Sequence, residues 1–177
     1  MKKLILFPFV LVIFSAHAQM IDMSKWKTQV DRKFFSSIKY PPDWTVVDVN
    51  EDGYAIYSPK EGPNDQYQEN VSIAIITTPP GAKNLKVKDF AEANYIEFKK
   101  QLKDCKLLAD KPMQLFGTDV YFVMYNGINE QGQYVYFKQN FMIYNGAFYI
   151  LTYSGEAGKK DAFATIGGDM MMTFKLN

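Results

Sequence analysis

Short apolar runs separated by turn-forming residues predict that most of this chain folds into β-strands, because β-branched and aromatic residues fit the pleated surface of a sheet. In the first half of the chain we expect strands over residues 34–39, 44–49, 54–58 and 71–78. In the second half we expect strands over residues 113–126, 133–144 and 147–153. Pro41 and Pro42 end the first strand, since a proline has no backbone N–H to donate to a ladder.

The connections between these strands are typical of hairpins. Asn-Gly is the strongest short hairpin signal, and it occurs at Asn126-Gly127 and at Asn145-Gly146. The cluster Asn50-Glu51-Asp52-Gly53 predicts a further hairpin, and residues 59–69 predict a polar loop. Because hairpins join neighbouring antiparallel strands, the pattern predicts an antiparallel sheet.

The strand expected at residues 133–144 is apolar on both of its faces. One face carries Val135, Phe137, Phe141 and Ile143, and the other carries Tyr134, Tyr136, Met142 and Tyr144. An antiparallel sheet with one face in water alternates more cleanly between apolar and polar residues. We therefore expect that each face of the sheet is covered.

Two later segments carry apolar residues at helical spacing and can supply these covers. Residues 86–106 predict a helix with an apolar stripe of Ala91, Tyr95, Phe98, Leu102 and Cys105. The C-terminal segment predicts a second helix with a stripe of Phe163, Ile166, Met170, Met171 and Phe174. Gly167 and Gly168 lie inside it, and a glycine costs a helix about 1 kcal/mol relative to alanine. We therefore expect a kink or a break there.

These elements define an α+β fold in which an antiparallel β-sheet is flanked by helices, an α/β/α sandwich. No repeat, low-complexity tract or long linker divides residues 34–177, so we expect a single domain over that range. Residues 19–33 form a polar N-terminal lead-in. Within the lead-in, the spacing of Met23, Trp26 and Val30 is compatible with a short amphipathic helix.

The segment 1–18 has the three parts of a secretory signal peptide. Lys2 and Lys3 supply the positive start, residues 4–14 are an apolar run, and Ala16-His17-Ala18 matches the small-x-small cleavage pattern. The apolar run is shorter than the roughly 20 residues that a membrane-spanning helix needs. We expect cleavage between Ala18 and Gln19, which gives an exported protein, periplasmic or extracellular, soluble and without an integral membrane span.

Charge and histidine content exclude several classes of function. The chain has 20 Lys and Arg residues and 19 Asp and Glu residues, and loss of Lys2 and Lys3 with the signal leaves it near neutral. The basic residues form no cluster in the sequence, so we expect no binding to nucleic acid. The single histidine, His17, also leaves with the signal, which excludes Ser-His-Asp and Cys-His catalysis and the usual zinc sites.

Residues 48–53 match the first half of an EF-hand calcium loop, with oxygen ligands at Asp48, Asn50 and Asp52 followed by a glycine. The second half of the motif is missing, because the last loop position should be a bidentate glutamate and is Pro59 here. We interpret the segment as a hairpin turn. Weak calcium binding near these three residues is the alternative.

The other reactive residues have ordinary explanations. Cys105 lies near Lys103 and Lys106, and nearby cations activate thiols, but its place on the helical stripe predicts a half-buried structural cysteine. Six acids are available to a carboxylate-based enzyme, and most lie in turns or at strand ends: Asp43, Asp48, Glu51, Asp52, Glu69 and Asp119. Nothing in the sequence brings two of them together, so we predict no catalytic residue, no metal ligand and no cofactor.

The later strands are rich in tyrosine, a residue enriched where partner proteins dock. We predict that these side chains crowd one side of the sheet: Tyr121, Tyr125, Tyr134, Tyr136, Tyr144, Tyr149 and Tyr153. Packing beneath a helix is the ordinary interpretation. If the helices leave that side bare, the tyrosines mark a binding surface.

Residues 35–44, Phe-Ser-Ser-Ile-Lys-Tyr-Pro-Pro-Asp-Trp, resemble the opening of the PsbP-like family, in which a short strand runs into a Tyr-Pro-Pro-x-Trp turn. The later helix, the aromatic strands and the closing residues 163–174 are similar to that family as well. The resemblance implies an antiparallel sheet between helices and the role of an accessory binding module. PsbP itself is an extrinsic accessory subunit of photosystem II, and no motif here ties the chain to photosynthesis.

Export, this resemblance and the missing catalytic set favour an exported, non-enzymatic accessory module. We expect it to bind another exported or envelope protein through an aromatic sheet face. A carrier of an apolar small molecule is the alternative, and it requires an apolar cavity of roughly 300 Å³ or more. A carboxylate-based hydrolase is the second alternative, and it requires two acids that converge in a cleft.

Overall fold

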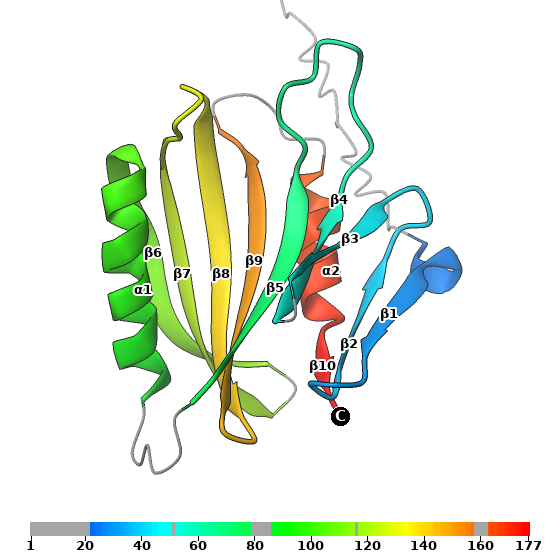
Figure 1. The fold of residues 1–177 in the computed structure, drawn as a ribbon, viewed down its shortest axis with the longest axis vertical. Coiled ribbons are helices and arrows are strands. Elements are labelled where there is room, and N and C mark those ends of the chain that lie inside the picture. Colours follow the sequence, from blue (N-terminus) through cyan, green and yellow to red (C-terminus); the bar gives the residue numbers. More distant parts are fainter. Residues whose placement is uncertain (1–21, 51, 79–85, 116, 158–162) are drawn as a thin grey trace, which may run out of the picture.

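The computed structural model describes residues 22–50, 52–78, 86–115, 117–157 and 163–177. The predicted signal peptide and its cleavage site lie outside these ranges. The main element is an antiparallel sheet, which within these ranges has seven strands in the order β3-β4-β5-β9-β8-β7-β6 (Figure 1). Their bounds are Thr45–Asn50 (β3), Gly53–Tyr57 (β4), Asn70–Thr77 (β5), Ala147–Glu156 (β9), Tyr134–Tyr144 (β8), Thr118–Ile128 (β7) and Lys103–Leu115 (β6).

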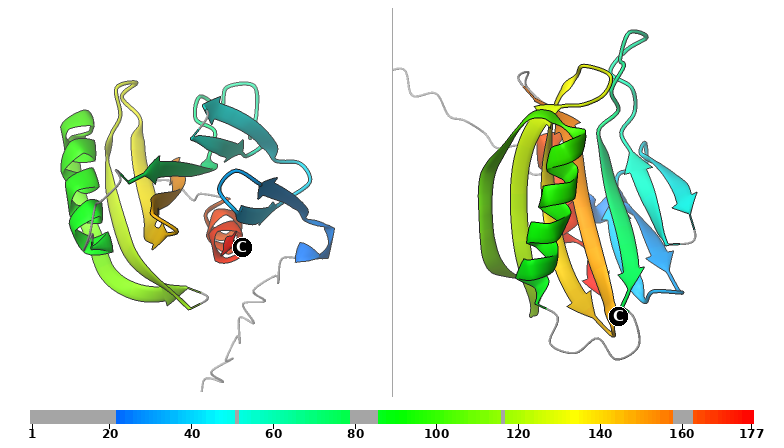
Figure 2. Two further views of the ribbon diagram at one scale, coloured as in Figure 1. Left: turned by 60° about the horizontal axis from the view of Figure 1, so that its bottom comes forward. Right: turned by 60° about the vertical axis from the view of Figure 1, so that its left-hand side comes forward.

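A helix covers part of each face of this sheet. α1 (Val87–Gln101) packs on β6, β7 and β8, whereas α2 (Ala164–Met172) packs on the opposite face against β9 and β5. Figure 2 shows the two helices on either side of the sheet. A small sheet of β1 (Lys27–Asp31), β2 (Ser36–Tyr40) and β10 (Lys175–Leu176) adjoins α2, and the 3-10 helix η1 (Met23–Lys25) precedes it.

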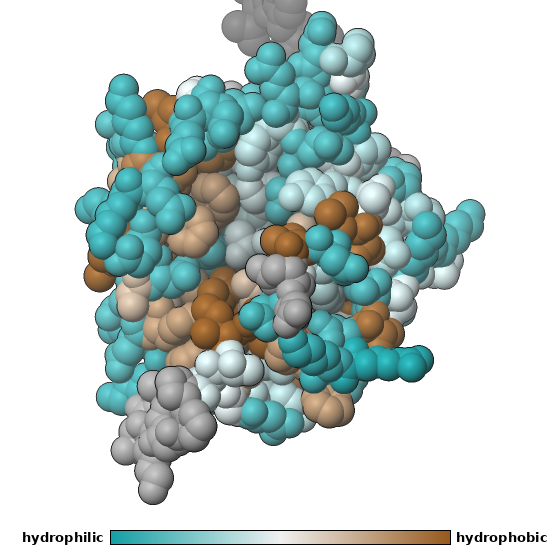
Figure 3. Space-filling view, in the orientation of Figure 1, coloured by the Kyte–Doolittle hydropathy of each residue, from teal (hydrophilic) through white to brown (hydrophobic). Residues whose placement is uncertain are grey.

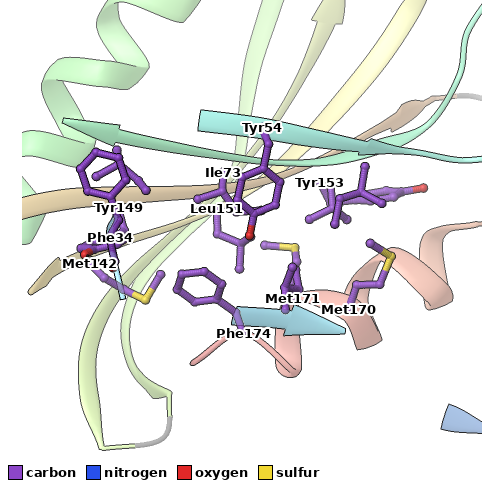
Figure 4. Close-up of a cluster of buried hydrophobic side chains, with 14 of the residues drawn as sticks. Phe34, Tyr54, Ile73, Met142, Tyr149, Leu151, Tyr153, Met170, Met171 and Phe174 are labelled. Atoms are coloured by element: carbon purple, nitrogen blue, oxygen red, sulfur yellow. Dashed lines mark hydrogen bonds between the residues drawn. The ribbon is translucent and has the colours of Figure 1, made fainter. Parts of the chain in front are cut away.

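The larger core lies between the sheet and α2. Figure 4 shows the side chains that fill it: Tyr54, Ile73, Leu151 and Tyr153 from the sheet, and Met170, Met171 and Phe174 from the C-terminal segment. The Tyr149 hydroxyl donates a hydrogen bond to the carbonyl oxygen of Phe34 at 2.9 Å, which ties β9 to the turn before β2. A second core lies on the other face of the sheet, where Phe90, Tyr95 and Phe98 of α1 pack against β7 and β8.

The predicted α+β fold, an antiparallel sheet flanked by helices, is confirmed. The hairpin expected at Asn145-Gly146 joins β8 to β9, and both residues have positive φ, 45° and 72°, as a type I′ turn requires. Asn126-Gly127, by contrast, lies inside β7, and the loop follows it. Gly127 is needed there because a β-carbon would come within 2.9 Å of Cβ of Leu102.

The first predicted helix is too long. α1 ends at Gln101, and β6 begins at Lys103, so Cys105 lies on a strand and not on a helix. Leu102 and Cys105 still pack into the core beneath α1, because the chain reverses beside that core. Asp104 has a positive φ of 54°, and the β6–β7 register shifts twice nearby. The helical spacing of Leu102 and Cys105 therefore arose from two different elements.

The strand expected over residues 113–126 is really the end of β6 and most of β7. A turn at Gly117 separates the two strands, and this glycine has a φ of 80°, in the left-handed region that glycine favours. The sequence prediction missed this turn, although the polar residues Thr118 and Asp119 directly follow the glycine. β6 and β7 consequently form a long antiparallel pair at one edge of the sheet.

The predicted break at Gly167-Gly168 is wrong, since α2 runs unbroken from Ala164 to Met172. A β-carbon at Gly167 would overlap the ring of Tyr153, so this glycine lets the helix approach the sheet closely. A β-carbon at Gly168 would meet no described atom within 4 Å beyond its chain neighbours and the backbone of its own helix. The two adjacent glycines therefore have different surroundings.

The prediction of a short helix in the lead-in is also wrong beyond the first turn. Only η1 is helical, and Val30 belongs to β1, which pairs with β2 in antiparallel register. Pairing with β2 outweighs the weak helical spacing of three residues. Among the helices of the described ranges, none has the length and apolar character needed to cross a bilayer.

Candidate functional site

α2 covers only part of its face of the sheet. It is nine residues long and contacts β9 and β5, whereas α1 contacts β6, β7 and β8 from the other face. Among the described elements, no helix covers part of the surface that these three strands present toward α2. Met113, Phe122 and Asn140 lie on this surface.

An open groove of about 350 Å³ lies between α2 and β6, β7 and β8. We name it the α2 groove. The strands contribute Lys111, Met113, Phe122, Lys138 and Asn140, and the helix contributes Gly168, Met171 and Met172. Apolar side chains dominate the lining, and the Met172 side chain is 51% exposed.

The strand register explains why these side chains share one surface. Phe122 pairs with Lys111 on one side and with Asn140 on the other. Residues paired directly across antiparallel strands point to the same face of a sheet, with their β-carbons about 5 Å apart. Lys111, Phe122 and Asn140 therefore form one row across the floor of the groove.

The groove carries positive charge. The described residues that line it include Lys111 and Lys138, and none of them is acidic. The Lys138 ammonium lies 5.6 Å from the ring centroids of both Tyr136 and Tyr153, within the range of a cation–π interaction. The ion pairs found between described residues involve neither groove lysine. Both charges are therefore available to an anionic group of a ligand.

Gly168 leaves part of the helical side of the groove without a side chain. Apart from its chain neighbours and the backbone of its own helix, no described atom lies within 4 Å of the position that a β-carbon would take. Gly167, one residue earlier, is buried against Tyr153. This contrast makes position 168 a place where the groove can be narrowed without disturbing the core.

Sequence reasoning did not single out Lys111, Phe122, Lys138 or Asn140. The alternation of Phe122 and Met124 along β7 was a usable signal, because residues two apart on a strand share a face. That signal does not tell which strands a nine-residue helix leaves bare. The position of α2 over β9 supplies the missing information.

The predicted tyrosine face is wrong. Tyr121 and Tyr125 pack beneath α1, whereas the α2 side receives Tyr136, Tyr144, Tyr149 and Tyr153, and Tyr134 is 42% exposed. The register gives the reason: Tyr121 pairs with Phe141, but Tyr149 pairs with Met142, the next residue along β8. Most of these tyrosines are core residues, as the ordinary interpretation had it.

The buried tyrosines beneath α1 have internal hydrogen-bond partners. The Tyr121 hydroxyl donates to Oδ2 of Asp110 at 2.6 Å, and this bond, with burial, raises the pKa of Tyr121 to about 12. The Tyr125 hydroxyl donates to Oε1 of Gln139, whose Nε2 donates to Oγ1 of Thr152, both at 3.1 Å. Burial is the main cause of the raised pKa of Tyr125. These contacts are structural.

The candidate acids do not converge. Asp43, Asp48, Asp52 and Asp119 are exposed. Asp119 lies on β7, and β4, β5, β9 and β8 separate it from Asp48 on β3. Glu69 is buried, and the Ser58 hydroxyl donates to its Oε2 at 3.4 Å. The sixth acid, at position 51, lies outside the described residues.

The half-motif for calcium forms the predicted hairpin between β3 and β4. Asp48 and Asn50 lie on β3, where the register shifts between them, and Asp52 follows in the turn. One Asp52 carboxylate oxygen is 3.5 Å from the Lys33 ammonium. Across the ranges that the structure describes, no group of three or more metal-binding side chains gathers here or elsewhere.

Cys105 is half-buried with a free thiol, as predicted, although from a strand. It packs against the core beneath α1. Tyr95 of α1 lies beside it, and the pKa of Tyr95 is raised, first by burial and then by the neighbouring thiol. The position is that of a core cysteine.

A larger cavity, of about 660 Å³, lies where the start of α1 meets the ends of β6 and β7. Its lining mixes Lys86, Lys88, Gln114 and Asp119 with apolar residues. Lys86 directly follows residues 79–85, which the structure does not describe. The face that carries α1, seen in Figure 3, shows hydrophobic surface in separate patches divided by hydrophilic residues. Because the lining of the larger cavity mixes charged and apolar residues, whereas the α2 groove is lined mainly by apolar side chains, we take the α2 groove as the candidate site.

Neither a known protein family nor a curated protein matches this sequence. Solved structures do match it. The solution structure of cyanobacterial PsbP (CyanoP) from Synechocystis sp. PCC 6803 aligns over 89% of this chain and 96% of that one, with a TM-score of 0.62 and 13% identity. PA94, a protein of unknown function from Pseudomonas aeruginosa, aligns over 84% and 94%, with a TM-score of 0.58 and 16% identity.

A crystal structure from Bacteroides thetaiotaomicron VPI-5482 also matches, with a TM-score of 0.60 and 12% identity. The alignment covers 86% of this chain but 49% of that one, so the chain spans about half the length of the Bacteroides protein. Identities this low establish a shared fold and leave activity open. The chain thus has a PsbP-like fold, as the resemblance at residues 35–44 predicted.

Proposed function

We propose that this protein is an exported, non-enzymatic binding module that docks another exported or envelope protein in the α2 groove. One observation carries the proposal: an apolar floor built from Met113 and Phe122 lies open beside α2, with Met171 and Met172 along its side. Uncovered apolar surface rimmed by polar residues marks sites of interaction. Residues 19–177 contain no histidine, so catalysis that depends on an imidazole is not open to them, and the candidate acids lie apart.

The openness of the groove favours a protein over an apolar small molecule. Sites for small molecules bury about 70–90% of the ligand surface, and an open groove leaves one side of a small ligand in water. A protein partner brings its own surface to close that side. The volume of about 350 Å³ nevertheless meets the size expected for an apolar carrier, so the carrier is the second candidate function.

Site-specific cross-linking in the native compartment tests the proposal. A photoreactive amino acid replaces Met172, which borders the groove, and a matched control replaces Ile96 on α1. The two side chains are similarly exposed, at 51% and 55%. We expect position 172 to give a cross-link to one envelope protein, identified by mass spectrometry, and position 96 to give none to that protein.

Purified components then decide whether the captured protein is a true partner. The proposal requires that the partner binds the purified wild-type protein and loses affinity when Met172→Glu places a charge beside the apolar floor. Equal capture from positions 172 and 96, or equal affinity for the Met172→Glu variant, contradicts it. Native mass spectrometry of protein from its own host, with an apolar adduct lost in the same variant, would support the carrier instead.

A further inference from the structure

We infer that the partner enters the α2 groove as an amphipathic α-helix whose apolar face is flanked by acidic residues. This inference rests on the proposed function and names the chemistry of the docking element. The width of the groove, its charges and the kind of side chain that lines it support such a helix.

The strands that contribute to the floor of the groove span about the width of one helix. β6, β7 and β8 are neighbours in the sheet, and two inter-strand spacings of about 4.8 Å place the outer strands about 10 Å apart. An α-helix with its side chains is about 10 Å across. α1 already packs as a helix on the opposite face of the same three strands. A partner helix beside α2 would complete the layer on this face.

The two lysines of the groove determine which charged residues are favourable on the flanks of that helix. Lys111 lies on β6 and Lys138 on β8, so β7 and its Phe122 run between them. A helix laid over Phe122 has its apolar face on the floor and its two flanks near the two ammonium groups. Acidic residues on both flanks complement these charges, whereas basic residues are repelled.

The side chains of the groove suit a helix that repacks on contact. Met113, Met171 and Met172 line it, and the flexible, polarisable thioether of methionine adapts to the shape of an apolar partner. Recognition of an amphipathic helix in an apolar groove depends on such anchors at helical spacing.

The alternative of an added strand at the sheet edge is less favoured. β6 is an edge strand, but Pro112 has no N–H to donate and the register shifts twice along the strand. Several charged residues also lie along it, including Lys106, Asp110 and Lys111. These are the devices by which edge strands avoid pairing with another chain. The face of β6–β8, and not the edge, is the open surface.

Two synthetic helical peptides of about 18 residues test the inference by fluorescence anisotropy with the purified protein. Both have the same leucine face; one has glutamates on its flanks and the other has lysines. We expect the acidic peptide to bind about tenfold more tightly than the basic one at low salt. The double variant Lys111→Glu/Lys138→Glu should reverse this preference, and the equally charged control Lys25→Glu/Lys99→Glu should keep it.

The outcomes separate this inference from the proposed function. Equal binding of both peptides, or a preference that the groove variant does not reverse, overturns the acidic helix while a cross-link at position 172 still supports docking in the groove. Failure of both peptides to bind also overturns the helical partner. Failure of the cross-link at position 172 removes the proposed function whatever the peptides do.

Discussion

Gly167 of α2 lies against the ring of Tyr153 on β9 so closely that a β-carbon would overlap the ring. The contact places the helix over β9, and Tyr153 is completely buried beneath it. Because the short helix is held there, it cannot also shelter β6, β7 and β8. The contact between these two residues therefore creates the α2 groove.

Alanine at the two adjacent glycines should have opposite effects on stability. Gly167→Ala should lower the free energy of unfolding by roughly 1–3 kcal/mol, because the new methyl group overpacks the core at Tyr153. Gly168→Ala should raise it by up to about 1 kcal/mol, because alanine favours the helix and the space beside it is open. Urea unfolding of both variants checks this, and equal shifts would contradict the contact.

Gln139 should contribute more to the free energy of unfolding when Tyr125 is present than when Tyr125 is replaced by phenylalanine. Gln139→Leu leaves the buried Tyr125 hydroxyl without its acceptor and should cost about 1–3 kcal/mol. The double variant Tyr125→Phe/Gln139→Leu should cost less than the sum of the single variants, since it leaves no unpaired phenol at position 125, whereas the loss of the Thr152 contact is common to both variants that carry Gln139→Leu. Chemical denaturation of the three variants measures the coupling. Additive losses would show that the hydrogen bond is not formed.

Tyr121 should make the fold sensitive to alkaline pH. The hydrogen bond to Asp110, with burial, raises the pKa of this phenol to about 12, so the folded state keeps a proton that the unfolded state loses near pH 10. Stability from this group is therefore present below about pH 10 and is lost as the pH rises toward 12.

The matched comparison for this titration is the Tyr121→Phe variant. Its free energy of unfolding should fall less than that of the wild type between about pH 9 and about pH 11, because it lacks the shifted phenol. Asp110→Ala should act in the same direction by removing the acceptor. Parallel pH profiles for the wild type and both variants would refute the role of this pair.

Sequence patterns predicted the elements whose signals are local. The hairpin at Asn145-Gly146 needs positive φ at two successive residues, which that dipeptide tolerates. The apolar stripe ending in Cys105 led to a helix prediction that is too long. Residues of the helix and of the following strand pack into one core, and their spacing along the sequence looks helical. The end of α1 at Gln101 depends on the reversal of the chain after the helix, and the spacing of apolar residues does not reveal that reversal.

The candidate site could not be predicted in the same way. Phe122 and Lys138 look like ordinary residues of alternating strands, and their exposure follows from where α2 stops. Gly167 was interpreted as a helix breaker because its partner, Tyr153, lies on another element. The groove depends on tertiary packing of the helix, and only the register and the helix position together reveal it.

The affinity of the cross-linked partner for the Gly168→Leu variant tests the central claim most directly. The leucine should project into the open space of the α2 groove, and Gly168→Ala serves as the control for helix propensity. We predict that Gly168→Leu stays folded and weakens partner binding at least about tenfold, with little change for Gly168→Ala. Partner affinity equal to that of the wild type in a folded Gly168→Leu variant would contradict docking in the groove.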